Sequence, residues 1–486
     1  MKKKEKLSLW VEIYFFLRYH PHLMKIIIVG AGITGSELAY RLIAKNHDVV
    51  LIERNEEISR HAANRLDCMV IHAEGNDTQI LKDAAIAKAD ALIAVTDSDE
   101  LNMIICGIAE SLAPNVLKIA RVRNENYVSS LNSTKDNMLG IHSLVYPDEE
   151  GALAIKKIIE HGAISDILSF NDSPFEITQF NVEESSNLDG VMVKDLRTLL
   201  DAEFIVVAME KGNEYVVPSG ETMLTVGMRL SILMRAEQIE KFYNLAGLTL
   251  QTFKKIAIAG MSRIGRLLLE FLLQRQQSSS WKHLFKRFMN SQSITVIESN
   301  EKIAKQVAKD FPDVKVYNAD ITDEAFAEEV GLSTFDLVIS TTDNYELNMI
   351  SSTYLKTVGV KKTIALVQSR IMKNIAYKIG IDVAIAFKDV VVDSIMSKLL
   401  GKNVLGYHSM CDGTLEIIEL AVSQSSHVIG KALKDIAKHG IFLILLINKE
   451  GVYQIPKGET VIERDNKVIF IVDAKHSEEI VMMFSD

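Results

Sequence analysis

Residues 25–35 read KIIIVGAGITG, an apolar run of strand length followed by three glycines at the spacing GxGxxG. A helix-period pattern, GSELAYRLIA, begins at Gly35, so the loop lies between a strand and a helix, as a dinucleotide fingerprint requires. Gly30 permits the tight turn, Gly32 leaves room for a pyrophosphate, and Gly35 lets helix and strand pack closely. The helix N-terminus offers free N–H groups to phosphates. We therefore predict an NAD(H)-binding loop made of Gly30, Ala31, Gly32, Ile33, Thr34 and Gly35.

Glu53 ends the next apolar run, VVLIE, at the spacing of the acid that binds ribose hydroxyls. A carboxylate at this position repels a 2′-phosphate, so it favours NAD(H) over NADP, and the neighbouring Arg54 weakens this preference slightly. Because ligands bind outside the carboxyl ends of parallel strands, we expect further contacts from residues that follow later strands. These residues are Glu74, Thr96, Asp97 and Arg121. Glu100 and Asn102 have two open roles, a helix cap or a ligand contact. A Rossmann-like fold without ligand is the alternative for the whole site.

The chain repeats itself. Residues 96–104, TDSDELNMI, return as TDNYELNMI at 342–350, with seven of nine positions identical, and each copy follows an apolar strand downstream of a glycine loop. A later pair of turns, YVVPSGET at 215–222 and YQIPKGET at 453–460, also recurs. Two ordered matches at similar spacing indicate an internal duplication.

Each repeat alternates apolar strands with helical patterns and then becomes richer in strands. This order predicts an α/β protein of two tandem repeats, each a Rossmann-like doubly wound parallel sheet followed by a small α+β regulatory domain. The predicted parts are an extension at 1–23, a nucleotide-binding domain at 24–146, a linker helix at 147–171, a small domain at 172–247, a second nucleotide-binding domain at 252–388 with an insertion at 275–292, a linker helix at 389–411 and a small domain at 412–486. Five strands are expected in each parallel sheet, near 25–29, 48–53, 67–72, 90–95 and 117–122, and near 255–259, 293–298, 314–318, 335–340 and 362–367.

The second glycine loop is altered. Ser262 stands where the closest-approach glycine belongs, so its side chain crowds a pyrophosphate, although its hydroxyl and Arg263 could also contact a phosphate. Glu298 keeps the ribose acid, and Gln368 takes the place of Arg121 in this alignment. The candidate residues of this site are Gly260, Met261, Ser262, Arg263, Ile264, Gly265, Glu298, Asp320, Thr342 and Asp343. We expect this site to bind more weakly, to take another nucleotide or to stay empty.

Composition excludes several classes of protein. The formal net charge of −10 argues against a nucleic-acid binder, which needs a basic face. The three cysteines lie far apart without metal-ligand spacing, so neither a metal site nor a disulfide framework is predicted, and a reducing cytosol is expected. His161, His427 and His439 stand singly, without an acid–base partner in the sequence pattern, and no P-loop lysine or nucleophile elbow is present. We therefore predict no catalytic residues, and a sensor instead of an enzyme.

Two segments fall outside the repeat. Residues 1–23 combine Lys2, Lys3 and Lys4 with the apolar LSLWVEIYFFL, but Glu12 interrupts the apolar part and no cleavage site follows. Either Met24 is the true start or these residues form an appended amphipathic helix, and export is the weaker alternative. The insertion at 275–292 is either a solvated excursion or a basic amphipathic helix that contacts a membrane surface or membrane partner.

These motifs together resemble the TrkA family, whose members contain RCK (regulator of potassium conductance) units. The resemblance rests on GAGITG, Glu53, both copies of the TD-x-x-ELNM motif, Arg121 and the paired P-x-G-E-T turns, and it extends from Met24 to the C-terminus. It implies two RCK units per chain and self-association into a ring, as a dimer or tetramer of chains. The ring would be cytoplasmic, peripheral on the inner membrane, beneath a membrane potassium-translocating subunit.

The resemblance also implies that NAD(H), and in relatives ATP or ADP, alters the ring and so the gate. The family's cofactor positions fall on 30–34, Glu53, Thr96, Asp97 and Arg121, and in the second repeat on 260–264 and Glu298. Two alternatives remain open. One is an NAD-dependent oxidoreductase with an unrecognised substrate site, and the other is an RCK regulator of a different cation channel or antiporter.

Overall fold

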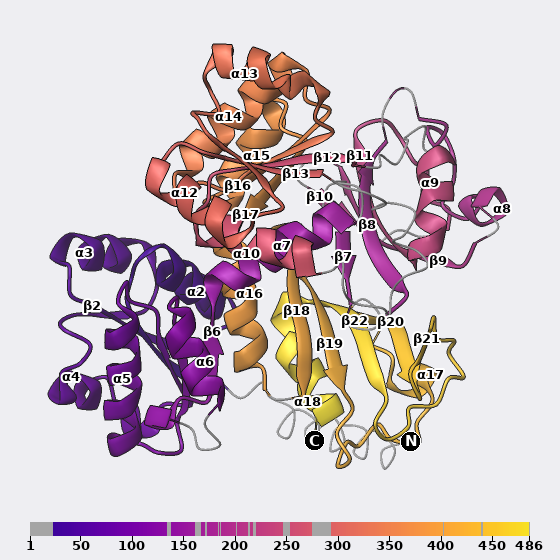
Figure 1. Ribbon diagram of the computed structural model, residues 1–486. Helices are drawn as coiled ribbons and strands as arrows, with labels where there is room; N and C mark the ends of the chain where they lie inside the picture. Colours follow the sequence, from indigo (N-terminus) through magenta and orange to yellow (C-terminus); the bar gives the residue numbers. More distant parts are fainter. Residues whose placement is uncertain are drawn as a thin grey trace. The chain divides into compact units, whose positions relative to one another are not determined.

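The computed structural model forms two compact units, one of residues up to Tyr146 together with Val392–Asp486, the other of Pro147–Val391 (Figure 1). The predicted extension, apart from Leu23, and the insertion at 275–292 lie outside the described residues. The structure describes residues 23–133, 138–160, 167–170, 173–182, 184, 186–200, 202–211, 214–216, 220–245, 253–274, 293–401, 403–438 and 441–485.

A six-stranded parallel sheet forms the core of the first unit, with the strand order β3-β2-β1-β4-β5-β6. Its strands consist largely of buried Ile, Val, Leu and Ala because helices cover both faces, as Figure 1 shows. The order reverses between β1 and β4, which is where open α/β sheets bind ligands. The strands are β1 (Lys25–Val29), β2 (Asp48–Glu53), β3 (Met69–His72), β4 (Ala91–Ala94), β5 (Leu117–Arg121) and β6 (Ser143–Val145). The helices are α2 (Ile33–Ala44), α3 (Glu56–Arg65), α4 (Thr78–Asp83), α5 (Asp99–Leu112) and α6 (Glu125–Ser133).

The second unit repeats this sheet with the order β14-β13-β12-β15-β16-β17. The two sheets confirm the predicted tandem Rossmann-like fold. Each has a sixth strand that the sequence did not predict, because β6 is only three residues long and β17 runs directly into a helix. The strands are β12 (Lys255–Ala259), β13 (Ser293–Glu298), β14 (Lys315–Asn318), β15 (Leu337–Ser340), β16 (Lys362–Val367) and β17 (Val383–Ala386). The helices are α10 (Arg263–Gln274), α12 (Glu301–Asp310), α13 (Glu324–Val330), α14 (Tyr345–Val358) and α15 (Arg370–Lys378).

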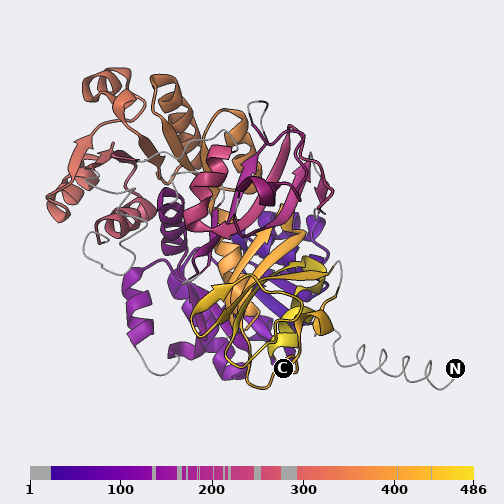
Figure 2. The same cartoon turned by 90° about the vertical axis from the view of Figure 1, so that its right-hand side faces the viewer.

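Each unit also holds a five-stranded antiparallel sheet. The one in the second unit, ordered β10-β9-β11-β8-β7, contains β7 (Ile167–Ser169), β8 (Phe175–Asn181), β9 (Phe204–Lys211), β10 (Glu214–Val216) and β11 (Met228–Arg235), with α8 (Leu196–Leu200) and α9 (Ile239–Leu245). The one in the first unit, ordered β18-β19-β22-β20-β21, contains β18 (Val404–Met410), β19 (Leu415–Ala421), β20 (Phe442–Lys449), β21 (Val452–Gln454) and β22 (Lys467–Asp473), with α17 (Leu433–Ile436) and α18 (Ser477–Ser485). Figure 2 shows the strands of the antiparallel sheet of the first unit, β18 to β22, in orange to yellow.

The expected linker helices are shorter than predicted. Helix α7 (Pro147–Glu160) and helix α16 (Phe387–Leu399) are followed by β7 and β18, which join the small sheets. Gly401, with a φ of +117°, follows α16, and a residue with a side chain adopts this conformation only at a cost. The segments 147–171 and 389–411 therefore each contain a helix and then a strand.

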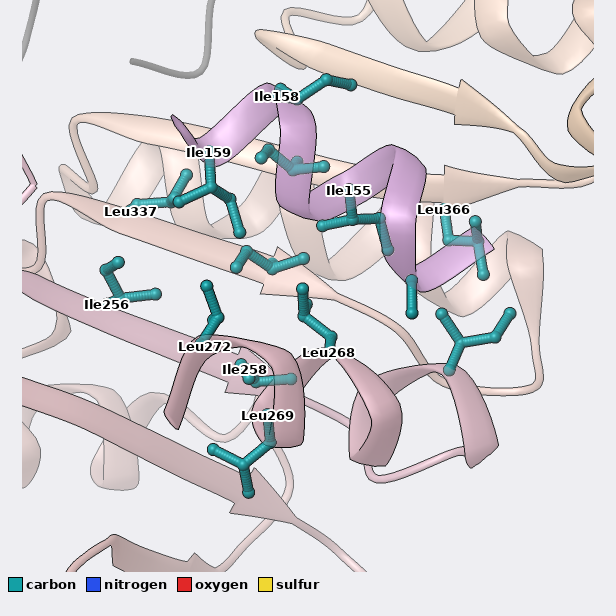
Figure 3. Close-up of a cluster of buried hydrophobic side chains, with 14 of the residues drawn as sticks. Ile155, Ile158, Ile159, Ile256, Ile258, Leu268, Leu269, Leu272, Leu337 and Leu366 are labelled. Carbon is teal, nitrogen blue, oxygen red and sulfur yellow. The ribbon is translucent and has the colours of Figure 1, made fainter. Parts of the chain in front are cut away.

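Helix α7 packs on the second parallel sheet and its helix α10. Figure 3 shows Ile155 and Ile159 of α7 facing the side chains of α10 and of the sheet. These residues belong to one buried cluster that also contains Leu268, Leu272 and Leu366. Apolar burial therefore holds α7 against the second Rossmann-like lobe.

In the first unit, ion pairs join helix α2 to α16 and to the small domain. Arg41 of α2 pairs with Asp393 of α16 at 2.6 Å. Lys45, at the end of α2, lies 2.7 Å from both Glu416 Oε1 and Ser477 Oγ of the small domain that ends the chain. These contacts attach helix α2 to that small domain through nearly buried charges.

A buried carboxyl group makes the stability of the first small domain depend on pH. Glu176 of β8 is 6% exposed, and burial, followed by the nearby Glu160, raises its pKa from 4.5 to about 8. The folded state therefore binds a proton that the unfolded state has released between pH 4.5 and about 8, so stability falls as the pH rises through this window. We expect Glu176→Gln to remove this part of the pH dependence of the thermal midpoint, whereas Glu237→Gln, at an exposed position, should keep it. If the thermal midpoint changed equally with pH in both variants, Glu176 would not be the group responsible for this pH dependence.

Candidate functional site

The first glycine loop has the geometry of an anion-binding turn. Gly30 has a φ of +106°, and a Cβ there would lie 3.0 Å from the backbone nitrogen of Thr96. A Cβ on Gly35 would overlap the carbonyl oxygen of Gly30. At Gly32, in contrast, no atom lies within 4 Å of an added Cβ. Gly30 and Gly35 are therefore required by the fold, whereas Gly32 leaves a space that the protein itself does not use.

Helix α2 begins at this space. Its N-cap is Gly32, so no side chain accepts a hydrogen bond from the first turn. The N–H groups of that turn and the positive end of the helix dipole thus remain available to an anion. This is the arrangement that a pyrophosphate needs.

Glu53 is hydrogen-bonded to the backbone of the loop. Its Oε2 accepts a hydrogen bond from the backbone nitrogen of Ala31 at 2.7 Å, and its Oε1 accepts one from that of Asn55 at 2.8 Å. The carboxylate therefore sets the position of the loop relative to β2. A carboxylate has further lone pairs, so ribose hydroxyls could donate to the same oxygens.

Asn102 has neither of the two roles that the sequence left open. Its Oδ1 accepts hydrogen bonds from the nitrogen and hydroxyl of Thr96 at 2.8 and 2.7 Å, and its Nδ2 donates to the carbonyl oxygens of Thr96 at 3.1 Å and Arg121 at 2.8 Å. The side chain is fully buried and joins the chain after β4 to the end of β5. The cap of helix α5 is Ser98, whose hydroxyl accepts from the nitrogen of Leu101. The repeated asparagine is therefore structural.

Arg121 is the last residue of β5, at the carboxyl-terminal end of the parallel strands, and part of its guanidinium group has no partner in the described part of the chain. Nη2 donates to the carbonyl oxygen of Thr96 at 2.7 Å and to Asp97 Oδ1 at 3.0 Å. Nε is buried and has no hydrogen-bond partner among the described residues. Burial, followed by Arg123, lowers the pKa of Arg121, and Asp97 opposes this shift. A buried, unpaired donor beside an open glycine loop fits a ligand that carries an acceptor.

The structure brings most candidates of the first site together. The glycine loop, Glu53, Thr96, Asp97 and Arg121 are linked by the contacts above. Glu74 follows β3 and is exposed, and no described contact joins its side chain to the others. Ile33 is 53% exposed.

The second site keeps the framework of the first. Glu298 accepts hydrogen bonds from the nitrogens of Met261 and Asn300, each at 2.7 Å. Asn348 repeats the contacts of Asn102, accepting from Thr342 and donating to the carbonyl oxygens of Thr342 and Leu366. Asp320 and Asp343 are exposed, and Asp320 accepts hydrogen bonds from Thr322.

One sequence alignment of the two sites was wrong. Asn102 donates to the carbonyl of Arg121 and Asn348 to that of Leu366, so Leu366, and not Gln368, occupies the position of Arg121. The alignment with Gln368 is two residues out of register with the Ile-Ala pair that the two strands share, Ile119-Ala120 and Ile364-Ala365, because no motif after the fifth strand is repeated to guide it. The hydrogen bonds of the buried Asn102 and Asn348 side chains supply the correct register.

No helix in the described part of the chain is long and apolar enough to cross a membrane. Within the same residues, no group of three or more His, Cys, Asp or Glu side chains is placed to hold a metal ion.

The fold and its two glycine loops define a class of protein with duplicated Rossmann-like lobes and paired small antiparallel domains. Residues 26–147 and 256–386 match the TrkA-N domain, and residues 177–247 and 417–485 match the TrkA-C domain. The chain belongs to the family of tandem TrkA-N and TrkA-C proteins.

Similar proteins cover nearly the whole chain. The Trk system potassium uptake protein TrkA homolog of Archaeoglobus fulgidus is 27% identical, over 95% of this chain and 100% of its own length. The Trk system potassium uptake protein TrkA of Halomonas elongata is 25% identical, over 95% of this chain and 98% of its own length. Among solved structures, the GsuK channel bound to NAD is 18% identical with a TM-score of 0.55, covering 98% of this chain and 83% of that chain, a likeness of fold.

Proposed function

We propose that the chain is a nucleotide-sensing regulatory subunit of a potassium uptake system, and that it binds NAD(H) at the first glycine loop. The observation that carries the proposal is a family membership spanning both repeats, combined with one loop whose central glycine faces open space. The names of the relatives, Trk system potassium uptake proteins, support the transport role. The proposed domain boundaries are those of the sequence analysis, with β7 and β18 assigned to the small domains.

The residues of the first unit define how binding could be transmitted. Gly32 and the first turn of α2 hold the pyrophosphate, Glu53 holds a ribose and Arg121 offers Nε to an acceptor. Helix α2 extends from this loop to Lys45, whose ammonium contacts Glu416 and Ser477 of the small domain. A displacement of the α2 N-terminus therefore reaches the small domain through one rigid element.

The response is a shift between conformations of the assembled chains. A ligand changes that balance only through its different affinity for the two conformations, and a coupling of about 1 to 3 kcal/mol is typical. When bound, NAD(H) would supply a pyrophosphate and two riboses as recognition groups. We propose no reaction on it, because the side chains around the loop serve to hold the backbone.

We further propose that chains assemble into a ring on the cytoplasmic face of the membrane, against a potassium-translocating subunit. ATP or ADP would compete for the same loop, since both carry the pyrophosphate that the loop recognises.

The test is reconstitution. Vesicles containing the membrane subunit should take up potassium faster or slower when the purified chain is present, and the two should co-purify from detergent extracts. If the chain neither co-purifies nor alters uptake, and instead oxidises NADH with a small carbonyl compound, the oxidoreductase alternative replaces this proposal.

Lys45 should uncouple binding from response. We expect Lys45→Met to leave the NADH affinity within about twofold, since Lys45 lies at the opposite end of α2 from the loop. The nucleotide effect on potassium uptake should fall markedly, because Glu416, 2% exposed, loses its cation and one of the polar contacts between the α2 end and the small domain is removed. Lys88→Met, on an exposed part of the same lobe, is the control. Full nucleotide regulation in Lys45→Met would contradict the proposed route.

A further inference from the structure

Three differences separate the second glycine loop from the first, and each acts against a bound phosphate. The first difference is Ser262. Its hydroxyl accepts a hydrogen bond from the backbone nitrogen of Gly265 at 3.3 Å, in the first turn of α10. At the first loop this position is Gly32 and no side chain caps the turn. Ser262 thus occupies part of the space and one of the donors that a phosphate would use.

The second difference is a carboxylate next to the loop. Asp148 at the N-terminal end of helix α7 is 8% exposed, and its Oδ2 lies 4.0 Å from Nη1 of Arg263. Arg263 is the one cation of the loop, and the Asp148 carboxylate lies at the outer limit of an ion pair with it. A phosphate approaching this turn would therefore meet a negative group beside the cation, which the first loop does not present.

The third difference is the missing arginine. Leu366 occupies the place of Arg121, is 1% exposed and belongs to the apolar core of the second lobe. The unpaired buried Nε that marks the first site therefore has no counterpart here.

Helix α7 packs against the second glycine loop. Met261 and Ile264, which replace Ala31 and Thr34, are each 6% exposed and belong to the same buried cluster as Ala152 and Ile155 of α7. A Cβ on Gly151 would lie 3.4 Å from Ile264 Cδ1, so α7 and the loop are in close contact. Glu298 is explained by the same role, since it holds the loop backbone as Glu53 does in the first lobe.

We propose that the second glycine loop is a docking surface for helix α7 and does not bind a pyrophosphate, so that each chain holds one nucleotide. This inference rests on the proposed function of the first loop. Ser262, Asp148 and Leu366 account for the difference in phosphate binding between the two sites. Met261 and Ile264 make the apolar contact with α7.

Equilibrium dialysis of the whole protein with NADH, and separately with ADP, tests the stoichiometry. We expect one equivalent of either ligand per chain, in competition with each other, and none in Gly32→Ala. Two equivalents, or one equivalent that survives in Gly32→Ala with a normal thermal midpoint, would overturn the inference while leaving nucleotide sensing in place. Zero equivalents in the unaltered chain would overturn the proposed function, and with it this assignment.

A pair of exchanged residues tests the docking role without any ligand. Ile264→Thr places the first-lobe residue in the second loop and should lower the thermal midpoint of the second unit, because it removes buried contacts to α7. The matched exchange Thr34→Ile, at a half-buried position, should change the midpoint little. Equal, small effects of both exchanges would show that the loop does not anchor α7.

Discussion

Gly32→Ala is expected to reduce NADH affinity at least about 100-fold while leaving the thermal midpoint unchanged. The backbone at Gly32 has φ −61° and ψ −169°, which alanine adopts readily, and an added Cβ would meet no protein atom within 4 Å. The methyl group would instead occupy the space where a pyrophosphate approaches the backbone. Calorimetric titration with NADH and a thermal unfolding curve measure both quantities on one preparation.

Gly35→Ala provides the contrast within the same loop. Its Cβ would overlap the carbonyl oxygen of Gly30, so the start of α2 must move and the first lobe should unfold at a lower temperature. If Gly32→Ala instead lowered the midpoint as much as Gly35→Ala does, Gly32 would be a folding glycine and not part of a binding site. Unchanged NADH affinity in a folded Gly32→Ala would likewise contradict the site.

Asn102→Ala should be among the most destabilising single substitutions in the first lobe. It would leave the backbone nitrogen of Thr96 and the carbonyl oxygen of Arg121 without the hydrogen bonds that the fully buried Asn102 side chain makes, whereas the carbonyl oxygen of Thr96 keeps its hydrogen bond from Arg121. Each unsatisfied buried group costs about 1 to 3 kcal/mol, so we expect a loss of roughly 3 kcal/mol, seen as a lower denaturation midpoint. Because Thr96 and Arg121 lose their positions, NADH affinity should fall as well.

The repeat supplies a matched control for this effect. Asn348→Ala removes the same set of hydrogen bonds in the second lobe. We expect a similar loss of stability there, with NADH affinity in the folded protein preserved. A variant of Asn348 that lost NADH binding without unfolding would contradict the separation of the two sites.

Much of the fold was predictable because its determining features are local. Ten of the strands are apolar runs bounded by turns, and the duplicated motifs fixed the order of the domains. The strands β6 and β7 were not predictable in this way, since each has only three residues and shows no periodicity. Strand β17 runs directly into α16, and β18 is interrupted by Gly406, where its register shifts, so neither stood out from the helical segment beside it.

The glycine loop of the candidate site was predictable from the sequence. The side chains that hold the loop and the neighbouring strand ends in place were harder to predict. Asn102 resembled a cap because it lies near a helix start, and only the fold shows that its amide joins two strand ends. The match of Leu366 with Arg121 follows from aligning Ile119-Ala120 with Ile364-Ala365, and the hydrogen bond from Asn348 to the carbonyl oxygen of Leu366 gives the same register. The contact of α7 with the second loop joins segments about a hundred residues apart in sequence, and such packing leaves no local pattern.

The measurement that tests the central claim most directly is potassium uptake by vesicles that contain the membrane subunit and the purified chain, recorded against NADH concentration. For the unaltered chain we predict that uptake changes with NADH over the same concentration range as binding, and that Gly32→Ala gives a flat response. A Gly32→Ala response with the same midpoint as the unaltered chain, or no response in either, would contradict the claim that the first glycine loop is a sensor.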